Sequence, residues 1–311
     1  RARRTQSRGG RIAAAALLFV ALTLRHNALP AVVPIAVFIA MASKRGPRRV
    51  WLGRGAALVV LLALAAALLD RAVDERRSVF PATALWDLAA ISIQTNTILL
   101  PPGTYGPALT VDDLAQAFDE FSNTSLFART RAGLRQPFFA ADDPLNAAVH
   151  AAWLDAILAH PGAYLRHRWR LTRALFGTRP RTWPHELVYV DGEIQYADNS
   201  PVAPNDGAIH GALVRGFENA RDGWWFAAWP YLVLAIGAFA ATWRRTCADP
   251  VPARVVLLSG LLYAAPLPVV APSAELRYLG WTCVAAILGA VLAFAAPRRS
   301  ALTSSAYPPA P

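Results

Sequence analysis

Three short polar segments of this chain combine charged, polar and aromatic side chains beside apolar sequence. They are Arg25-His26-Asn27, Asp142-Asp143 and Glu275-Leu276-Arg277-Tyr278. Charged residues at the ends of apolar segments are costly unless they are solvated or paired, so we interpret these residues as functional candidates. Arg25, His26, Arg277 and Tyr278 would suit the binding of an anionic, lipid-linked substrate, and Asp142, Asp143 and Glu275 are the candidate catalytic acids or bases. The alternative is anchoring, in which Arg25 and Arg277 reach lipid phosphate and Glu275 pairs with an Arg.

A second candidate binding element is a row of arginines. Arg166, Arg170 and Arg173 are spaced at i, i+4 and i+7, which places them on one face of a helix, with Leu165 and Trp169 close by. Such a row is typical of a helix lying at an anionic interface. Because arginine offers planar bidentate donors, the same row could also grip a diphosphate.

Metal and nucleophile chemistry have little support in the sequence. The histidines show no ligand spacing, so we predict no metal site and no cofactor. Asp142-Asp143 could bind a divalent cation, although Asp143 is already explained as a helix cap before Pro144. A Gly-rich phosphate loop, a Gly-x-Ser-x-Gly elbow and a Cys-His pair are all missing from the sequence, so nothing indicates nucleotide hydrolysis or serine or cysteine catalysis.

The elements that would position these residues are apolar. The chain is 55% hydrophobic, and the excess lies in discrete runs. These runs are Ile12–Leu24, Ala28–Ala42, Gly55–Leu69, Trp224–Thr242, Val255–Val270 and Trp281–Ala296. We therefore predict a membrane α-helical fold with about six transmembrane helices, although several runs are shorter than the roughly 20 residues that cross a bilayer. In the alternative, residues 12–42 form one long tilted helix with Arg25 inside the membrane.

Charge predicts the orientation. Basic clusters border the apolar runs at Arg1–Arg11, Lys44–Arg54, Arg244–Arg254 and Arg298-Arg299, whereas residues 70–224 hold 14 Arg against 18 Asp plus Glu. Because Lys and Arg are retained on the cytoplasmic side, we expect both termini to be cytoplasmic and the middle of the chain to be outside a bacterial cytoplasmic membrane. The expected regions are residues 1–69 and 225–297 in the membrane, an extracytoplasmic domain at 70–224 and a disordered tail at 298–311.

The same charge pattern argues against a nucleic-acid partner. The pI is about 10.6, but the basic residues punctuate apolar runs instead of lining one face, and the expected partner is the lipid bilayer. The chain begins with Arg, and we expect an N-terminal part to be missing.

The expected extracytoplasmic domain is mainly helical. The predicted helices are Thr83–Ser92, a helix capped by Thr110 that runs to about Phe121, one from Asp143-Pro144 to near Pro161, and Gly162–Phe176 ending at Gly177. One strand pair is expected. Alternating arms around Asp191-Gly192 in residues 187–196 are typical of a β-hairpin.

Three segments carry a resemblance to a known class. They are residues 153–168, residues 272–278 and Arg25–Pro30. Together they resemble bacterial multi-pass membrane proteins similar to the GT-C class of integral-membrane glycosyltransferases. The resemblance implies a polyprenyl-phosphate-linked sugar as donor and a catalytic acidic residue in the first external loop.

This chain departs from that class where the acid is expected. Its early external turn at Arg25-His26-Asn27 has no carboxylate, so either the missing N-terminal part carried that loop or the chain is not a complete enzyme. There are two alternatives to an enzyme. In the first, the external domain docks envelope proteins or polysaccharide without catalysis. In the second, the chain is a subunit of a transporter.

Overall fold

The computed structural model describes residues 8–25, 28–41, 47–72, 78–129, 133–178, 207–220, 223–244 and 250–294. These residues form helices joined by loops, and their only β pairing is an isolated antiparallel bridge between Ser122 and Ser273. The predicted mainly helical fold is therefore confirmed for the described part of the chain. The predicted hairpin at 187–196 and the tail at 298–311 lie outside it.

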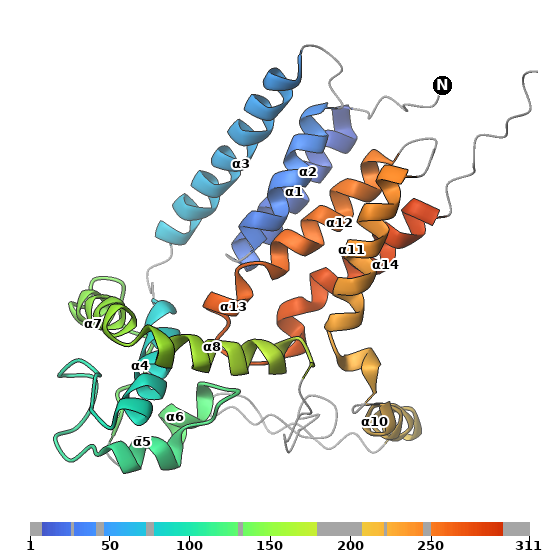
Figure 1. Cartoon of the computed structure of the whole chain (residues 1–311). Coiled ribbons are helices and arrows are strands. Elements are labelled where there is room, and N and C mark those ends of the chain that lie inside the picture. The colour runs from blue at the N-terminus through green and yellow to red at the C-terminus, as the bar shows by residue number, and fades with distance from the viewer. Residues whose placement is uncertain are drawn as a thin grey trace, which may run out of the picture.

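One half of the molecule is a bundle of apolar helices built from both ends of the chain. Its helices are α1 (Arg8–Leu24), α2 (Leu29–Met41), α3 (Arg48–Arg71), α11 (Trp229–Arg244), α12 (Val251–Ala264) and α14 (Gly280–Phe294). Two short helices connect α12 to α14, namely α13 (Leu267–Val270) and η3 (Leu276–Leu279). Figure 1 shows that these helices lie side by side and that the remaining helices gather at one end of the bundle.

Three helical segments are long and apolar enough to cross a membrane: Arg48–Arg71, Val251–Val270 and Leu276–Phe294. The other three apolar runs form shorter helices, with 17 residues in α1, 13 in α2 and 16 in α11. A helix rises about 1.5 Å per residue, so these three fall short of a straight crossing of about 30 Å. By length and composition, the structure therefore supports three spanning helices where the sequence predicted about six.

The first two apolar runs form separate helices. α1 ends at Leu24, and the N–H of Ala28 donates to the carbonyl of Arg25 (2.9 Å), which closes a turn before α2 begins at Leu29. Pro30 follows in the first turn of α2, where a missing N–H costs nothing. The alternative of one continuous helix over residues 12–42 is therefore wrong.

Small residues set the contacts inside the bundle. A Cβ on Gly289 of α14 would lie 2.4 Å from Leu257 of α12, and a Cβ on Gly260 of α12 would lie 2.6 Å from the Cβ of Ala285. Close backbone approach at small residues is typical of helices that pack in lipid, where hydrophobic burial drives association only weakly. A hydrogen bond also joins an N-terminal helix to a C-terminal helix of the bundle. The Ser259 hydroxyl of α12 donates to the carbonyl of Ala31 in α2 (2.7 Å).

The helical domain at one end of the bundle is organised around α4 (Phe80–Thr95). Around α4 lie α5 (Val111–Ala117), α6 (Thr124–Arg129), α7 (Leu145–Ala159) and α8 (Pro161–Leu175). The segment Ala84–Ile91 is almost completely buried on all sides. This explains why the sequence of α4 has no polar face: a helix that is apolar all round belongs in a core.

Capping residues in the sequence predicted where α5 and α7 of this domain begin. The Thr110–Asp113 capping box forms, and the carboxylate of Asp143 accepts from the N–H of Leu145 (2.9 Å) at the start of α7. The helix after Thr110 ends at Ala117 and not near Phe121, because Asp119 accepts from the N–H of Phe121 (2.8 Å) and turns the chain. Among the α-helices of the described residues, α6 and α10 (Ala208–Ala220) were not predicted.

Candidate functional site

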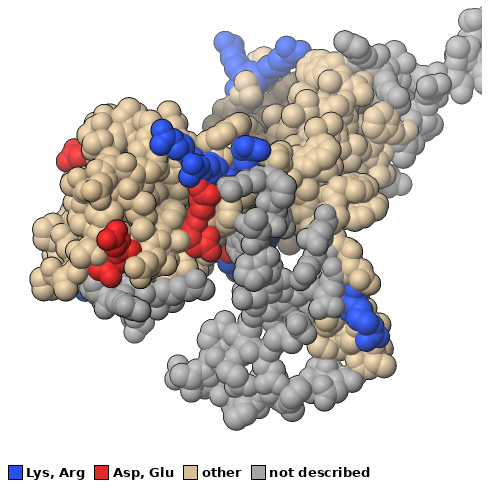
Figure 2. Space-filling view, turned by 60° about the horizontal axis from the view of Figure 1, so that its bottom comes forward, with Lys and Arg blue, Asp and Glu red and all other residues tan. Residues whose placement is uncertain are grey.

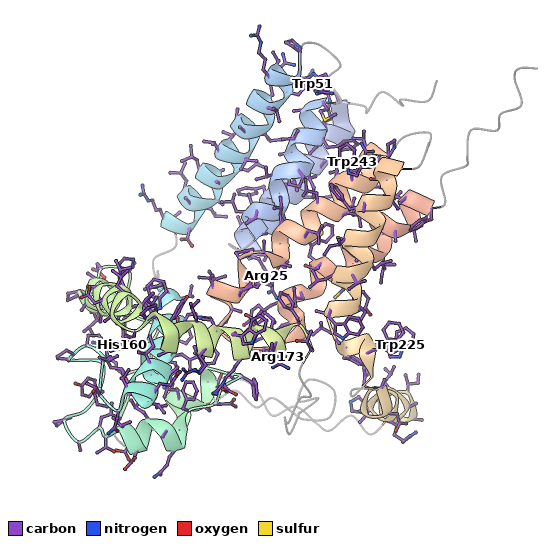
Figure 3. The ribbon with its side chains drawn as sticks, in the orientation of Figure 1. Arg25, Trp51, His160, Arg173, Trp225 and Trp243 are labelled. Carbon is purple, nitrogen blue, oxygen red and sulfur yellow. The ribbon has the colours of Figure 1, made fainter. Side chains whose placement is uncertain are left out.

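An apolar groove lies between α1, α2, α12 and α14. Its volume is about 660 Å³, and its walls include Leu17 and Ala21 of α1, Val32 of α2, Tyr263 of α12 and Trp281 of α14. Among the described residues that line it, the only charged ones are Arg25 and Arg277. Arg25 follows the last residue of α1, and Figure 3 shows it at the end of the bundle that faces the helical domain. The groove is therefore apolar along the bundle and cationic at that end.

Four of the predicted site residues meet at this cationic end. Arg25 and Arg277 both lie against the ring of Tyr278, with guanidinium carbons 5.9 Å and 5.3 Å from the ring centroid. Glu275 pairs with the Nε of Arg277 and accepts a hydrogen bond from the hydroxyl of Ser273 (2.6 Å). We call Arg25, Glu275, Arg277 and Tyr278 the groove mouth. His26 lies outside the described residues.

Polar atoms also occur inside the groove. Trp281 donates its indole N–H to the Ser259 hydroxyl (3.0 Å), and Ser259 in turn donates to the backbone of α2. These bonds join three of the four helices that form the groove. The wall is therefore held in place by hydrogen bonds as well as by apolar packing.

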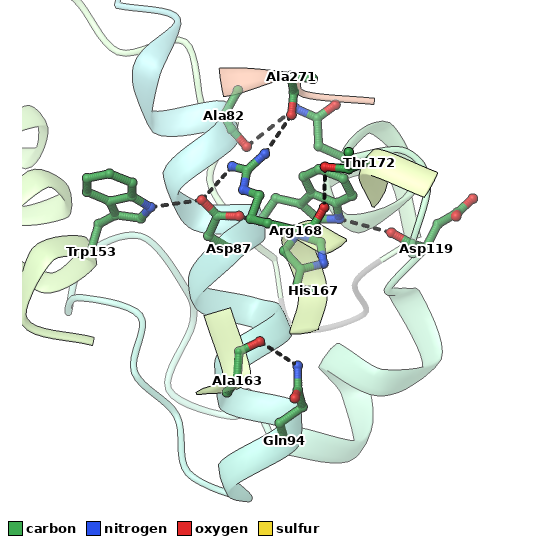
Figure 4. Close-up of polar contacts among 12 residues, drawn as sticks. Ala82, Asp87, Gln94, Asp119, Trp153, Ala163, His167, Arg168, Thr172 and Ala271 are labelled. Atoms are coloured by element: carbon green, nitrogen blue, oxygen red, sulfur yellow. Dashed lines mark hydrogen bonds and ion pairs between the residues drawn. The ribbon is translucent and has the colours of Figure 1, made fainter. Parts of the chain in front are cut away.

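The core of the helical domain contains a fully buried ion pair. The carboxylate of Asp87 on α4 accepts from Arg168 on α8 (2.5 Å) and from the indole N–H of Trp153 on α7 (2.8 Å). The ring nitrogen of His167 lies 3.3 Å from the other carboxylate oxygen, without hydrogen-bond geometry. Figure 4 shows these side chains converging on Asp87 from both flanking helices. The desolvated carboxylate is thus neutralised by a partner that is itself buried, as a buried charge requires.

Tyr164 adjoins this ion pair. The guanidinium carbon of Arg168 lies 5.9 Å from the centre of its ring. Burial raises the pKa of Tyr164, and the negative charge of Asp87 raises it further. Tyr164 therefore stays protonated beyond the pH at which an exposed tyrosine ionises.

Arg168 also connects the domain to the groove mouth. Its second guanidinium nitrogen donates to the carbonyl of Ala271 (2.8 Å), at the start of the loop that carries Ser273 and Glu275. The same loop forms the Ser122–Ser273 bridge, and the N–H of Ala274 donates to the carbonyl of Phe121 (2.8 Å). The domain therefore holds the loop from which Glu275 and Arg277 project.

Asp87 and Arg168 were not predicted as a pair. The available signal was a single Asp inside the apolar segment Thr83–Ser92, since a carboxylate buried in a core needs a cation. Which basic residue pairs with Asp87 depends on how α8 packs against α4. That packing cannot be read from the spacing of residues along the chain.

The arginine row on α8 has partners inside the domain. Arg166 donates to the side-chain oxygen of Gln94 (3.1 Å), and Arg170 pairs with Glu120 (2.7 Å), while Arg173 is exposed on the same face. Figure 2 shows basic and acidic side chains lying against one another on this side of the molecule. Two members of the row therefore form intramolecular bonds within the helical domain.

The Asp142-Asp143 pair lies at the start of α7 in the helical domain, and neither residue lines the groove. Asp143 caps α7 and pairs with Arg135 (2.9 Å), and Asp142 is exposed in the preceding loop. Among the described residues, no group of three or more His, Cys, Asp or Glu side chains is arranged to hold a metal ion.

Comparison of the chain with protein-family models, curated proteins and solved structures finds no match. The groove and its mouth are therefore the features of this chain from which a function is inferred.

Proposed function

We propose that this protein is an integral membrane protein that binds a lipid-linked phosphate in the groove. The observation that carries the proposal is the apolar groove with Arg25 and Arg277 at one end. A lipid chain would lie along the wall of α1, and the phosphate would meet the two guanidinium groups, which are suited to phosphate oxygens.

The groove runs along α1 and is open at its side. Its lining on α1 runs from Ala14 to Arg25, which at 1.5 Å per residue is about 16 Å. Leu17 and Leu24 line it and are 70% and 77% exposed. A lipid chain could therefore enter sideways from the bilayer without opening the bundle.

The proposed orientation places the groove mouth outside a bacterial cytoplasmic membrane. α3, α12–α13 and η3–α14 would cross the bilayer, and α1, α2 and α11 would complete a six-helix bundle with tilt or local thinning of the lipid. The helix ends beside the basic clusters lie together at the end of the bundle away from the helical domain. This arrangement agrees with cytoplasmic retention of Lys and Arg.

As the activity, we propose glycosyl transfer from a polyprenyl-phosphate-linked sugar. The acceptor hydroxyl would form a bond to the anomeric carbon as the bond from that carbon to the phosphate oxygen breaks. Arg25 and Arg277 would stabilise the departing phosphate. Glu275 is the carboxylate at the groove mouth and would take the proton of the acceptor hydroxyl, once ligand phosphate displaces it from Arg277.

Binding can be tested separately from chemistry. The full chain in nanodiscs would be titrated with a fluorescent polyprenyl phosphate, and Arg25→Ala and Arg277→Ala should each weaken binding about tenfold. Arg135→Ala, an exposed arginine of the helical domain, is the charge-matched control and should bind normally. Unchanged affinity in both groove-mouth variants would refute the proposed phosphate site.

A steric pair tests the groove itself. Ala21→Trp fills the groove and should abolish binding, whereas Ala16→Trp places the same side chain on α1 at an exposed position that does not line it. Transfer would then be assayed with radiolabelled polyprenyl-phosphate sugars. Binding without transfer from any donor would reject the enzymatic activity and favour a protein whose external domain docks envelope components.

A further inference from the structure

Helix α10 presents an apolar face that the rest of the described chain leaves exposed. Ile209, Leu213 and Phe217 are 81%, 53% and 38% exposed. Their spacing at i, i+4 and i+8 places them on one side of the helix. Arg215 and Asn219 are four residues apart, share another side of the helix and are also exposed. α10 is therefore amphipathic, and none of the described residues covers its apolar side.

This apolar face continues into a cluster of tryptophans. The rings of Trp224 and Trp225 stack with centroids 3.7 Å apart, and both side chains are more than half exposed. Phe217 of α10 contacts Phe226 with ring centroids 6.1 Å apart, so α10 and the tryptophan segment form one surface. Trp229, which opens α11, is 43% exposed and extends it.

The tryptophan segment next to α10 is held by contacts with the end of α8 and with α11. The N–H groups of Ala228 and Trp229 donate to the carbonyl of Phe176 (3.1 and 2.9 Å), and the Tyr231 hydroxyl donates to the carbonyl of Trp225 (3.0 Å). Figure 1 shows α10 lying across the direction of α11, at the end of the bundle occupied by the helical domain. An amphipathic helix that lies across a bundle at its end matches the geometry of a lipid interface.

We infer that α10, Trp224, Trp225 and Trp229 form an anchor that inserts into the boundary between headgroups and acyl chains of the leaflet at the helical-domain end of the bundle. Two observations select lipid as the occupant. The surface is continuous with the exposed apolar side of α11, where Val233 and Ile236 are 62% and 58% exposed. It also ends in indole rings, which favour the headgroup region because one edge is polar and the body is apolar. The anchor does not depend on what the groove binds.

The test compares the two faces of α10 in the full chain. After replacement of the native cysteines Cys247 and Cys283 by Ala, Leu213→Cys and Asn219→Cys would each be labelled with the fluorophore bimane. The proteins would be placed in phosphatidylcholine nanodiscs with and without lipid that carries a nitroxide near the headgroup. We expect quenching at position 213 to exceed quenching at position 219 about threefold or more, as for a helix lying in the interface.

Equal quenching at the two positions would overturn the anchor. A second copy of the chain on this face is the rival occupant. It would give crosslinking of Leu213→Cys between protomers with a bismaleimide and little quenching by lipid, which would also overturn the anchor. Ile209→Cys against Arg215→Cys repeats the comparison one turn earlier, so a local folding defect in one variant does not decide the result.

Discussion

At the scale of single residues, the most consequential feature is the carboxylate of Asp87. Asp87 lies in α4, and the residues next to it in that helix are fully buried. Its carboxylate accepts hydrogen bonds from Arg168 of α8 and Trp153 of α7. A buried pair of this kind contributes little net stability compared with apolar residues, but loss of one member leaves an uncompensated charge. Asp87 and Arg168 therefore bring α4, α8 and the loop after α13 into one arrangement.

Asp87→Ala should destabilise the protein by about 3–5 kcal/mol, because Arg168 is left buried without its counter-charge. The free energy of unfolding would be measured by denaturant titration in detergent micelles. Glu120→Ala breaks the more exposed pair with Arg170 and should cost about 0–1 kcal/mol. Equal losses in the two variants would contradict the role assigned to Asp87. The double replacement Asp87→Leu with Arg168→Met should recover part of the loss.

Glu275 competes with ligand phosphate for Arg277. Because Glu275 pairs with that guanidinium at the groove mouth, Glu275→Gln should tighten binding of a polyprenyl phosphate about fivefold, the size of a partly exposed ion pair. The affinity would be measured in nanodiscs beside Glu120→Gln, which removes an equivalent charge from the helical domain. Weaker binding in Glu275→Gln would show that the carboxylate supports the ligand instead of opposing it.

At the scale of elements, the bundle depends on close approach between α12 and α14. Gly260 and Gly289 sit where a side chain would overlap the facing helix, and the Thr282 hydroxyl donates to the carbonyl of Gly260 (2.9 Å) at the same contact. In lipid, where apolar burial rewards association weakly, such small-residue contacts and hydrogen bonds supply most of the specificity. Because α12 and α14 form part of the groove wall, their packing helps to determine the shape of the groove.

Gly289→Ala should destabilise the bundle by about 1–3 kcal/mol, since its new methyl group would overlap Leu257. Gly237→Ala makes the same change in α11, where nothing lies within 4 Å of the added carbon, and should be neutral or slightly stabilising. Thermal unfolding in the same detergent would compare the two. A similar decrease in both melting temperatures would argue against the proposed helix contact.

At the scale of the whole molecule, the two ends of the bundle differ in what they carry. The helical domain and the groove mouth share one end, and the helix ends beside the basic clusters share the other. A ligand bound at Arg25 and Arg277 would therefore be presented to the domain that holds the loop of Glu275. We infer that an acceptor or partner approaches from the domain side.

Single cysteines can test this arrangement in cells. In a chain without its native cysteines, Asp155→Cys on the exposed face of α7 should react with a membrane-impermeant maleimide from outside, whereas Gly9→Cys at the start of α1 should react only after the membrane is opened. The opposite pattern of labelling would invert the proposed orientation. Reaction of both residues from outside would place the start of α1 and the helical domain on the same side of the membrane. That result would contradict a bundle that crosses the membrane.

Much of the helical layout was determined by local sequence. The Thr110 and Asp143 caps, the Gly177 stop at φ 71° and the apolar runs depend on interactions within a few residues, so the chain itself specifies where those helices begin or end. The same holds for the groove mouth in part. Charged and aromatic residues at the ends of apolar runs predicted Arg25, Glu275, Arg277 and Tyr278 as candidates, because such ends are expected at a common level in a membrane.

Only the tertiary structure decided which residues act together. The Asp87–Arg168 pair joins residues far apart in the sequence, the groove requires walls from both ends of the chain, and the Asp142-Asp143 pair lies outside the lining of the groove. Periodicity and charge report the environment of each segment separately, whereas a buried ion pair or a groove depends on how separate segments pack. For that reason the sequence predicted Arg25, Glu275, Arg277 and Tyr278 as separate candidates, and packing decided that these four lie at one end of the groove.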